Sequence, residues 1–550
     1  MLKHIALRYS GLFFLFSVFA FQSSCMKGKK VDLIIHNAKI YSVDGNYTIF
    51  DAMAVKDGKI VELGPERQIL NKYRCEEAID ANGKEVYPGF TDSHGHLLSL
   101  IDQKLNLDLR ETKSFDEVLF KLEKYAAKSS RKFIVARGWD QSLWALKEFP
   151  NNEKLNKLFP NIPVLLIRVD GHAALINECL MKKANLSKDS KIAGGKVIMA
   201  NNVETGLILD NAINEVTKLI PPFSLKEKQE TLLEIQEELF QYGITSVHEA
   251  GINFEDIQLF ESLIKSKKLN LNVYAMLYPT EKNKDFAKKN GHYVNKNLSI
   301  RSFKVVGDGS LGSRGACLKK PYSDDQHSHG FLLTSLADFK EISAFCRKVD
   351  YQMNTHAIGD STNKIVLDII AQTFKYKKDH RWRIEHAQVL DLIDIEKLTL
   401  YGAFPSVQPT HAVSDQRWAE NRIGKARLKG AYAYKSILDK TGIFALGTDF
   451  PVESFDPFLT IHAAVQRKNV QNLPKNGLLM NEAISLKECI QGMTLWPTFA
   501  CFQENKSGSL EKGKDATFFI ADLPVRSYST FQQNFAFMTF IKAKKVYSAE

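Results

Sequence analysis

Alternating hydrophobic and polar positions occur near both ends of the chain. Near the N-terminus, "VDLIIHNAKIYSV" and "DAMAVKDGKIVELG" alternate apolar and polar residues and are broken by Asp-Gly turns, a pattern typical of antiparallel hairpins. Near the C-terminus, "GSLEKGKDATFFIADLP" and "FIKAKKVYS" carry the same strand and turn signature. We therefore predict a composite β-sandwich domain formed by residues 26–88 and 505–550.

Between these ends, short apolar or β-branched runs are each followed by a segment with helical spacing. Eight runs stand out: "GFTDSH", "ITSVHEAG", "LNVYAMLY", "IRSFKVVGDG", "YQMNTHAIG", "RWRIEHAQ", "AFPSVQP" and "IFALGTDFP". Repeated βα units form a parallel sheet covered by helices, and eight of them close into a barrel. The pattern predicts an α/β fold, a (β/α)8 TIM barrel over residues 89–504.

The count of eight strands requires residues 109–230 to be an insertion between the first and second strands. This segment contains the strand-like pieces "KFIVARGWD" and "IPVLLIRVDGH". Segments of this length between two strands are usually functional or form lids. We therefore predict an α/β cap over the mouth of the barrel.

A set of polar side chains lies at the ends of the predicted barrel strands, where the reactive groups of such barrels are found. The set consists of His94, His96, Lys304, His356, His386 and Asp449. Because residues two apart in a strand share a face, His94 and His96 can both point into the mouth. Nitrogen and oxygen donors converging there predict a metal site that suits one or two zinc ions, with other divalent metals as alternatives. For His248 and His411, a hydrogen-bonded structural role and a ligand role both stay open.

Lys304 is unusual in such a set, because an ammonium group repels a metal. A deprotonated lysine that has captured carbon dioxide becomes a carbamate, whose two oxygens can bridge two ions. The alternative is a lysine whose stem packs while its head reaches solvent. Asp449, in "LGTDFP", is well placed to contact metal-bound water, and its alternative role is to cap the following turn.

The first 25 residues have the pattern of a secretory signal. Lys3 and Arg8 precede the apolar run "GLFFLFSVFAF", which is too short to span a bilayer. The ending "QSSC" resembles a bacterial lipoprotein cleavage site, in which Cys25 becomes the lipidated first residue, although Gln22 stands where an aliphatic residue is usual. We expect an exported lipoprotein anchored to a membrane and facing the periplasm or the cell exterior; a soluble secreted or periplasmic protein is the alternative.

Composition narrows the class of protein. With 44% hydrophobic and 25% charged residues, neither a disordered nor a fibrous class fits. The net charge of +11 is spread over lysine-rich helical stretches, without the basic cluster or module of a nucleic-acid-binding protein. The seven cysteines are widely spaced and include no CxxC pair, which argues against a zinc knuckle and a dense disulfide framework.

Nine motifs resemble those of a known family: "PGFTDSHGHL", "GWDQSLW", "RVDGHAALIN", "GITSVHEAG", "FKVVGDGSLGSR", "HAIGD", "RIEHAQ", "GTDFPVE" and "GSLEKGKDA". With them the chain resembles the amidohydrolase superfamily, family 3, the YtcJ-like metal-dependent hydrolases. The resemblance implies a barrel with a composite β-sandwich, a carbamylated Lys304 and Asp449 as proton shuttle. It also implies metal binding by His94, His96, His356 and His386. Thr517, where relatives tend to carry Asp, departs from the family pattern outside the proposed chemistry.

The resemblance further implies an activity. We expect metal-activated hydroxide to cleave a carbon–nitrogen bond other than a peptide bond, in a small amide, formamide or cyclic amide. Trp139, Asp140 and His172 of the predicted cap are expected to contact the substrate. Two alternatives stay open: a mononuclear zinc deaminase with unmodified Lys304, and a noncatalytic surface lipoprotein that binds a ligand. Whether the protein forms a homo-oligomer is also open.

Overall fold

A computed structural model describes residues 28–128, 132–192, 194–200, 203–375, 379–526 and 535–549. The predicted signal peptide and Cys25 lie outside these residues. In the part of the chain that is described, no helix combines the length and apolar character needed to cross a membrane.

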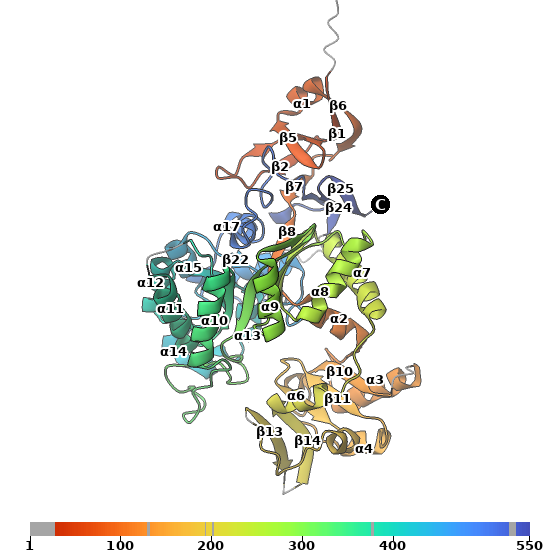
Figure 1. Ribbon diagram of the computed structural model, residues 1–550, viewed down its shortest axis with the longest axis vertical. Coiled ribbons are helices and arrows are strands. Elements are labelled where there is room, and N and C mark those ends of the chain that lie inside the picture. The colour runs from red at the N-terminus through yellow and green to blue at the C-terminus, as the bar shows by residue number, and fades with distance from the viewer. Residues whose placement is uncertain are drawn as a thin grey trace, which may run out of the picture.

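A nearly closed barrel of parallel strands lies at the centre of the molecule (Figure 1). Its eight strands are paired in chain order: β8 (Phe90–Gly95), β15 (Ile244–Ile252), β16 (Asn272–Leu277), β18 (Leu298–Val306), β19 (Gln352–Ala357), β20 (Arg383–His386), β21 (Phe404–Val407) and β22 (Ala445–Leu446). A short strand, β17 (Tyr293–Asn295), pairs antiparallel with β18 outside this ring. Each of the eight predicted runs overlaps one barrel strand, so the prediction of an eight-stranded parallel barrel is confirmed.

A buried carboxylate joins the first and last barrel strands. Asp92 Oδ1 accepts hydrogen bonds from the backbone N–H groups of His94 (3.0 Å) and Thr448 (3.1 Å), and the Thr448 hydroxyl donates to Asp92 Oδ2 (2.6 Å). Gly95 adds a parallel bridge to Phe450. These contacts hold the segments of His94 and Asp449 side by side, because each segment continues directly from one of the joined residues.

Amphipathic helices cover the barrel strands and share one continuous apolar core with them. The helices that surround or follow the barrel strands are α7 (Leu225–Gln241), α8 (Phe254–Lys265), α9 (Glu281–Asn290), α10 (Leu336–Val349), α11 (Asp360–Phe374), α12 (Leu392–Tyr401), α13 (Pro409–Asp415), α14 (Ala419–Leu428), α15 (Tyr434–Thr441), α16 (Pro457–Gln466), α17 (Leu486–Gly492) and α18 (Leu495–Ala500). The start of α7 shows why the chain turns helical there. The Ser224 hydroxyl accepts from the Glu227 N–H, and the Glu227 carboxylate accepts from the Ser224 N–H, so two otherwise free donors are satisfied.

Two sheets beyond the base of the barrel form the terminal sheet domain (Figure 1). One sheet has the order β5-β4-β1-β6 and consists of β1 (Lys29–His36), β4 (Ala52–Lys56), β5 (Lys59–Gly64) and β6 (Tyr73–Asp80), with α1 (Glu66–Lys72). The other has the order β25-β24-β23-β7-β2-β3 and consists of β2 (Lys39–Tyr41), β3 (Ile49–Phe50), β7 (Glu85–Pro88), β23 (Phe518–Ala521), β24 (Ala536–Ile541) and β25 (Lys544–Ser548). The second sheet therefore contains strands from both ends of the chain. Apolar side chains of the two sheets, including Leu33 and Phe518, share one core.

A separate α/β layer, the cap, lies between β8 and β15 in the sequence. Its mixed sheet has the order β13-β14-β12-β11-β10-β9 and consists of β9 (Leu107–Asp108), β10 (Ile134–Trp139), β11 (Val164–Arg168), β12 (Ala173–Ile176), β13 (Gly195–Ala200) and β14 (Val203–Asp210). Its helices are α3 (Phe115–Lys128), α4 (Glu153–Leu158), α5 (Glu178–Lys183) and α6 (Asn211–Thr217). Helix α2 (Leu97–Leu105) leads directly from His96 to the first cap strand. Figure 1 shows the cap at the end of the barrel opposite the terminal sheet domain.

Candidate metal centre

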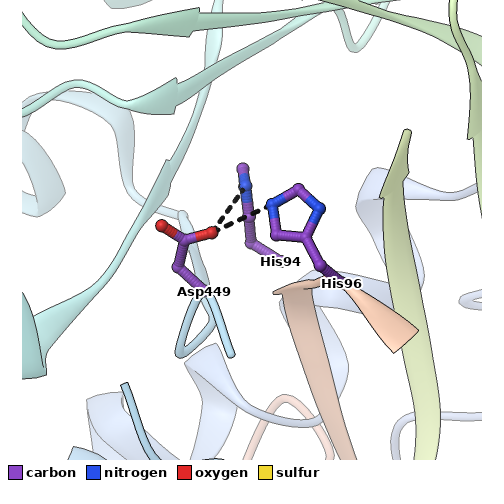
Figure 2. Close-up of side chains that lie close together, drawn as sticks. All are labelled: His94, His96 and Asp449. Atoms are coloured by element: carbon purple, nitrogen blue, oxygen red, sulfur yellow. Dashed lines mark ion pairs between the residues drawn. The ribbon is translucent and has the colours of Figure 1, made fainter. Parts of the chain in front are cut away.

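The six side chains predicted from the strand ends lie together at one end of the barrel. Asp449 Oδ1 lies 3.1 Å from His96 Nε2 and 3.5 Å from His94 Nε2, and Figure 2 shows the carboxylate directed at both rings. Lys304 Nζ lies 2.9 Å from His94 Nε2. The ring of His386 has its centroid 4.9 Å from that of His94 and 4.4 Å from that of His356. Five barrel strands thus contribute to one cluster.

Two residues of this cluster have unusual backbone conformations. His386 has φ 71° and Asp449 has φ 60°, in the left-handed region that residues other than glycine seldom occupy. Such strain persists where the surrounding structure enforces it, and it is enriched at functional sites. At both positions it directs a strand-end side chain toward the cluster.

The donor atoms fit a divalent metal ion. His94, His96 and Asp449 offer ligand atoms that all lie within 4.8 Å of one another, and so do His386, His411 and Asp449. At this end of the barrel, three buried ring nitrogens of the described structure have no hydrogen-bond partner: His356 Nε2, His386 Nδ1 and His411 Nε2. A buried polar atom without a partner costs free energy, and a cation that accepts imidazole lone pairs offsets that cost.

The protonation state of the histidines also suits a metal. Burial, reinforced by the charge of Lys304, lowers the pKa of His94 to about 4 and that of His356 to about 3. Burial likewise holds the pKa of His386 well below its ordinary value. These rings are therefore neutral near pH 7, the form that binds a metal.

Lys304 and Asp449 respond to burial in different ways. Burial lowers the pKa of Lys304 to about 8, against the opposing charges of Glu385 and Asp449. Burial alone would raise the pKa of Asp449. The hydrogen bond with His96 and the charges of His94 and His386 lower it by a larger amount, so the pKa of Asp449 lies well below its usual range. Near neutral pH the site therefore combines an ionised carboxylate with an amine that deprotonates readily.

A second layer of charged side chains supports His94 from inside the barrel. His94 Nδ1 lies 2.5 Å from Glu385 Oε2, which leaves Nε2 as the nitrogen directed at the cluster. Glu385 pairs in turn with Arg383, with Nε at 2.7 Å from Oε1 and Nη2 at 2.9 Å from Oε2. Arg383 Nη1 also donates to His248 Nδ1 at 2.8 Å. Partners of this kind fix the tautomer and orientation of a metal-binding histidine, and His248 belongs to this supporting layer.

The three cap residues predicted to contact substrate have partners within the cap. Trp139 is 1% exposed and its indole N–H donates to the backbone oxygen of Leu166 (2.8 Å), so it packs in the cap core. Asp140 is 6% exposed and pairs with Arg168 at 2.7 Å. His172 is half-buried and pairs with Asp210 at 2.9 Å, an interaction that raises the pKa of His172. Their contact with substrate stays a prediction.

The sequence analysis left the role of His411 open and did not predict a role for Glu385 or Arg383. His411 Nε2 lies 3.6 Å from Asp449 Oδ2, and its ring stacks on that of His386 with a centroid distance of 5.8 Å. It lies on helix α13, one turn beyond strand β21, where no strand periodicity applies. For the other two a signal existed, since Arg383 and Glu385 are two residues apart on one face of a buried strand.

Comparison with known proteins agrees with this site. The sequence profile of the amidohydrolase family, Amidohydro_3, matches residues 77–538. The YtcJ protein of Bacillus subtilis (strain 168) is 30% identical, over 88% of this chain and 93% of its own length. N-substituted formamide deformylase of Arthrobacter pascens is 21% identical, over 89% of this chain and 93% of its own.

A solved structure gives the same picture. The crystal structure of a metal-dependent hydrolase from Pyrococcus horikoshii OT3 matches with a TM-score of 0.75 at 28% identity, over 90% of this chain and 98% of that one. The family match covers the barrel and every residue of the cluster described above. This chain therefore belongs to the amidohydrolase family and is a metal-dependent hydrolase.

Proposed function

We propose that this protein hydrolyses a carbon–nitrogen bond other than a peptide bond, in a small amide, formamide or cyclic amide. One observation carries the proposal: an ionised Asp449 lies against two imidazoles, beside buried ring nitrogens that make no hydrogen bond in the described structure. The relative that acts on N-substituted formamides spans 89% of this chain, which supports this bond class. The proposed metal is zinc, bound by His94, His96, His356 and His386 together with carbamylated Lys304.

The chain's own residues supply the proton chemistry. A divalent cation held by these ligands supplies Lewis acidity, which makes water a competent nucleophile at neutral pH. The Asp449 carboxylate accepts the proton that water loses and donates it to the leaving nitrogen. A new carbon–oxygen bond forms, the carbon–nitrogen bond breaks, and the amine leaves neutral. His94 keeps its Nδ1 toward Glu385 throughout, so that its Nε2 stays available as a ligand.

Lys304 is proposed to act as a carbamate. Its pKa of about 8 leaves part of the amine neutral at physiological pH, and a neutral amine adds to carbon dioxide with loss of one proton. The product is an anion, which a cluster of imidazoles and cations stabilises better than it stabilises a buried ammonium. A mononuclear deaminase with unmodified Lys304 is the rival. It predicts one metal per chain and no mass increase on this lysine.

Replacing Asp449 by Asn tests the function. The zinc-loaded full chain is screened against N-acyl amino acids, formamides, cyclic imides and short dipeptides. On whichever compound the native protein hydrolyses, we expect Asp449→Asn to keep its zinc and to lose turnover by about 10²–10⁴-fold. Asp439→Asn, an exposed helical substitution that removes the same charge, is the control. Undiminished turnover by Asp449→Asn would remove the assigned role.

Export and anchoring at Cys25 are proposed from the first 25 residues alone. Labelling cells with a radioactive fatty acid tests this prediction. The native chain should take up label and the Cys25→Ala chain should not, while absence of label from both would favour the soluble secreted form.

A further inference from the structure

Arg137 stands out among the charged residues of the cap. In the described part of the chain its half-buried guanidinium makes no hydrogen bond and no ion pair. Three nearby groups of the cap are paired with other residues: Arg168 with Asp140 and Asp170, each at 2.7 Å, and His172 with Asp210 at 2.9 Å. Asp170 accepts from Arg168 on Oδ2 and from the His172 N–H on Oδ1 (3.1 Å), and it makes no hydrogen bond or ion pair with Arg137.

Arg137 lies at the end of the cap sheet that is tied to the metal centre. It pairs in register with Asp108 of β9, and β9 follows α2, which starts immediately after the proposed ligand His96. Its Nη2 lies 3.3 Å from where a Cβ on Gly171 would stand, beside His172 and Asp170. Figure 1 shows the cap beyond the end of the barrel that is opposite the terminal sheet domain.

Electrostatics agrees with this placement. Burial lowers the pKa of Arg137, while the charges of Asp170, Asp102 and Asp449 oppose the shift. Asp102 is on α2 and Asp449 is in the metal centre, so the guanidinium lies within electrostatic range of the proposed reaction site. It keeps its positive charge at any physiological pH.

A guanidinium in this setting fits one class of ligand. Its planar fork of N–H donors binds a carboxylate through two parallel hydrogen bonds. A partly desolvated cation without an acceptor is costly, and a ligand carboxylate offsets that cost. We propose that Arg137 binds a carboxylate of the substrate, so that the natural substrate is an anionic amide such as an N-acyl amino acid and not a neutral amide. This inference rests on the proposed function, whose metal centre would hold the other end of the same molecule.

Paired compounds test the proposal by binding. The zinc-loaded Asp449→Asn protein is titrated in a calorimeter with N-acetyl amino acids of varied side chain and with their carboxamides, which lack only the negative charge. We expect at least one carboxylate to bind ten times more tightly than its carboxamide. Adding Arg137→Gln to this protein should lower its affinity for that carboxylate at least tenfold and change its affinity for the carboxamide by less than twofold. Arg137→Lys, which keeps the charge without the fork, should fall between the two.

A matched control is available on the same cap. Arg110 is exposed and pairs with Asp108 at 2.7 Å, so Arg110→Gln removes the same charge and should leave both affinities unchanged. The proposal is overturned if every carboxylate binds no better than its carboxamide, or if Arg137→Gln weakens both members of a pair equally.

Kinetics separates this proposal from the proposed function. With the native catalytic residue present, Arg137→Gln should raise KM for the carboxylate substrate about tenfold and change kcat little. If the protein hydrolyses neutral amides, and this activity is lost in Asp449→Asn but unchanged in Arg137→Gln, the proposed function is supported and the carboxylate site is refuted. If carboxylates bind only when Arg137 is present, but the protein hydrolyses none of the compounds, the carboxylate site is supported and the proposed function is refuted.

Discussion

Replacing Glu385 by Gln removes one charge from the layer that supports the metal centre and keeps an acceptor oxygen for His94. Glu385 and Arg383 are both 0% exposed. The carboxylate lies 2.5 Å from His94 Nδ1, and its two oxygens lie 2.7 and 2.9 Å from Arg383 nitrogens. The substitution leaves the Arg383 charge buried without its counter-ion, so we expect losses of both stability and metal affinity.

The size of each loss follows from the contacts that remain. Removing one partner of a buried ion pair costs about 3–5 kcal/mol. Arg383 keeps hydrogen bonds to Ser93 O (2.6 Å) and Ser406 Oγ (2.9 Å), so we place the loss near the lower limit, about 3 kcal/mol. Loss of a carboxylate behind a metal-binding histidine lowers metal affinity by about 10–100-fold.

Two measurements check these values on the full chain. Chemical denaturation of the metal-free protein gives the change in unfolding free energy, and competition with a coloured chelator gives the zinc affinity. The double variant Glu385→Gln/Arg383→Met removes both buried charges, and it should recover part of the stability lost by the single variant. Glu396→Gln, which breaks an exposed pair with Lys440, is the control and should change stability by less than about 1 kcal/mol.

The reasoning fails on either of two results. If Glu385→Gln matches the native protein in stability and zinc affinity, the ion pair does not support His94. If the double variant is as unstable as the single variant or more so, the loss does not come from a stranded Arg383 charge.

Three further predictions concern other parts of the molecule. Dialysis against a chelator should abolish hydrolysis and added zinc should restore it; activity that survives full metal removal contradicts the metal centre. Thr448→Val removes the donor to Asp92 Oδ2 (2.6 Å) and should destabilise the barrel by about 1–3 kcal/mol in denaturation; unchanged stability contradicts its role in closure. Asp210 raises the pKa of His172, so their pairing stabilises the cap below about pH 6.5, and this stabilisation is lost as the pH rises through the pKa of His172 in the folded protein. Asp210→Asn should lower the pKa of His172 in an NMR titration. An unchanged pKa of His172 contradicts the pairing.

The barrel was predictable because its signal is local. Each parallel strand is buried on both faces, so it leaves a short apolar run whatever surrounds it. Even β22, only Ala445–Leu446, is found in the run "IFALGTDFP". The bounds were less predictable: the run "RWRIEHAQ" contains only the four-residue strand Arg383–His386, because the chain leaves the sheet where His386 and Ala387 take positive φ.

The meeting of the strand-end side chains at one end of the barrel was predictable for a similar reason, but the contact of Glu385 with His94 was not. His94, His356 and His386 each end a recognisable strand, and strand ends converge in any barrel of this kind. Glu385 and Arg383 alternate with apolar residues, so the pattern alone equally suits a solvent-facing edge. Only the closed barrel shows that this face is internal and that Glu385 meets His94 across 291 positions of sequence.

The cap shows where pattern reasoning stops. Asp140 follows a strand end, as Asp449 does, so the sequence pattern does not distinguish the two carboxylates. In the structure β10 and β11 are parallel neighbours, which brings Arg168 to Asp140 across 28 positions. The ion pair with Arg168 is a contact that the sequence pattern did not predict, and the contact of Asp140 with substrate stays a prediction.

The hydrogen-bond and ion-pair partners of a buried side chain therefore distinguish structural residues from candidate functional residues better than residue type does. Native proteins satisfy nearly all buried polar groups, and inside this barrel Arg383 Nη2 donates to Glu385 Oε2 at 2.9 Å. At the mouth, His356 Nε2 and His411 Nε2 make no hydrogen bond, although each lies near a carboxylate, at 3.7 Å from Asp308 Oδ1 and 3.6 Å from Asp449 Oδ2. Within the described residues the Arg137 guanidinium of the cap makes neither a hydrogen bond nor an ion pair. Ring nitrogens without a hydrogen-bond donor favour a bound cation, and an unpaired guanidinium favours a bound anion. The two proposals are therefore consistent with each other: a cation held by the imidazoles and a substrate carboxylate held by Arg137 would place the negative charge of the substrate away from the bond that breaks.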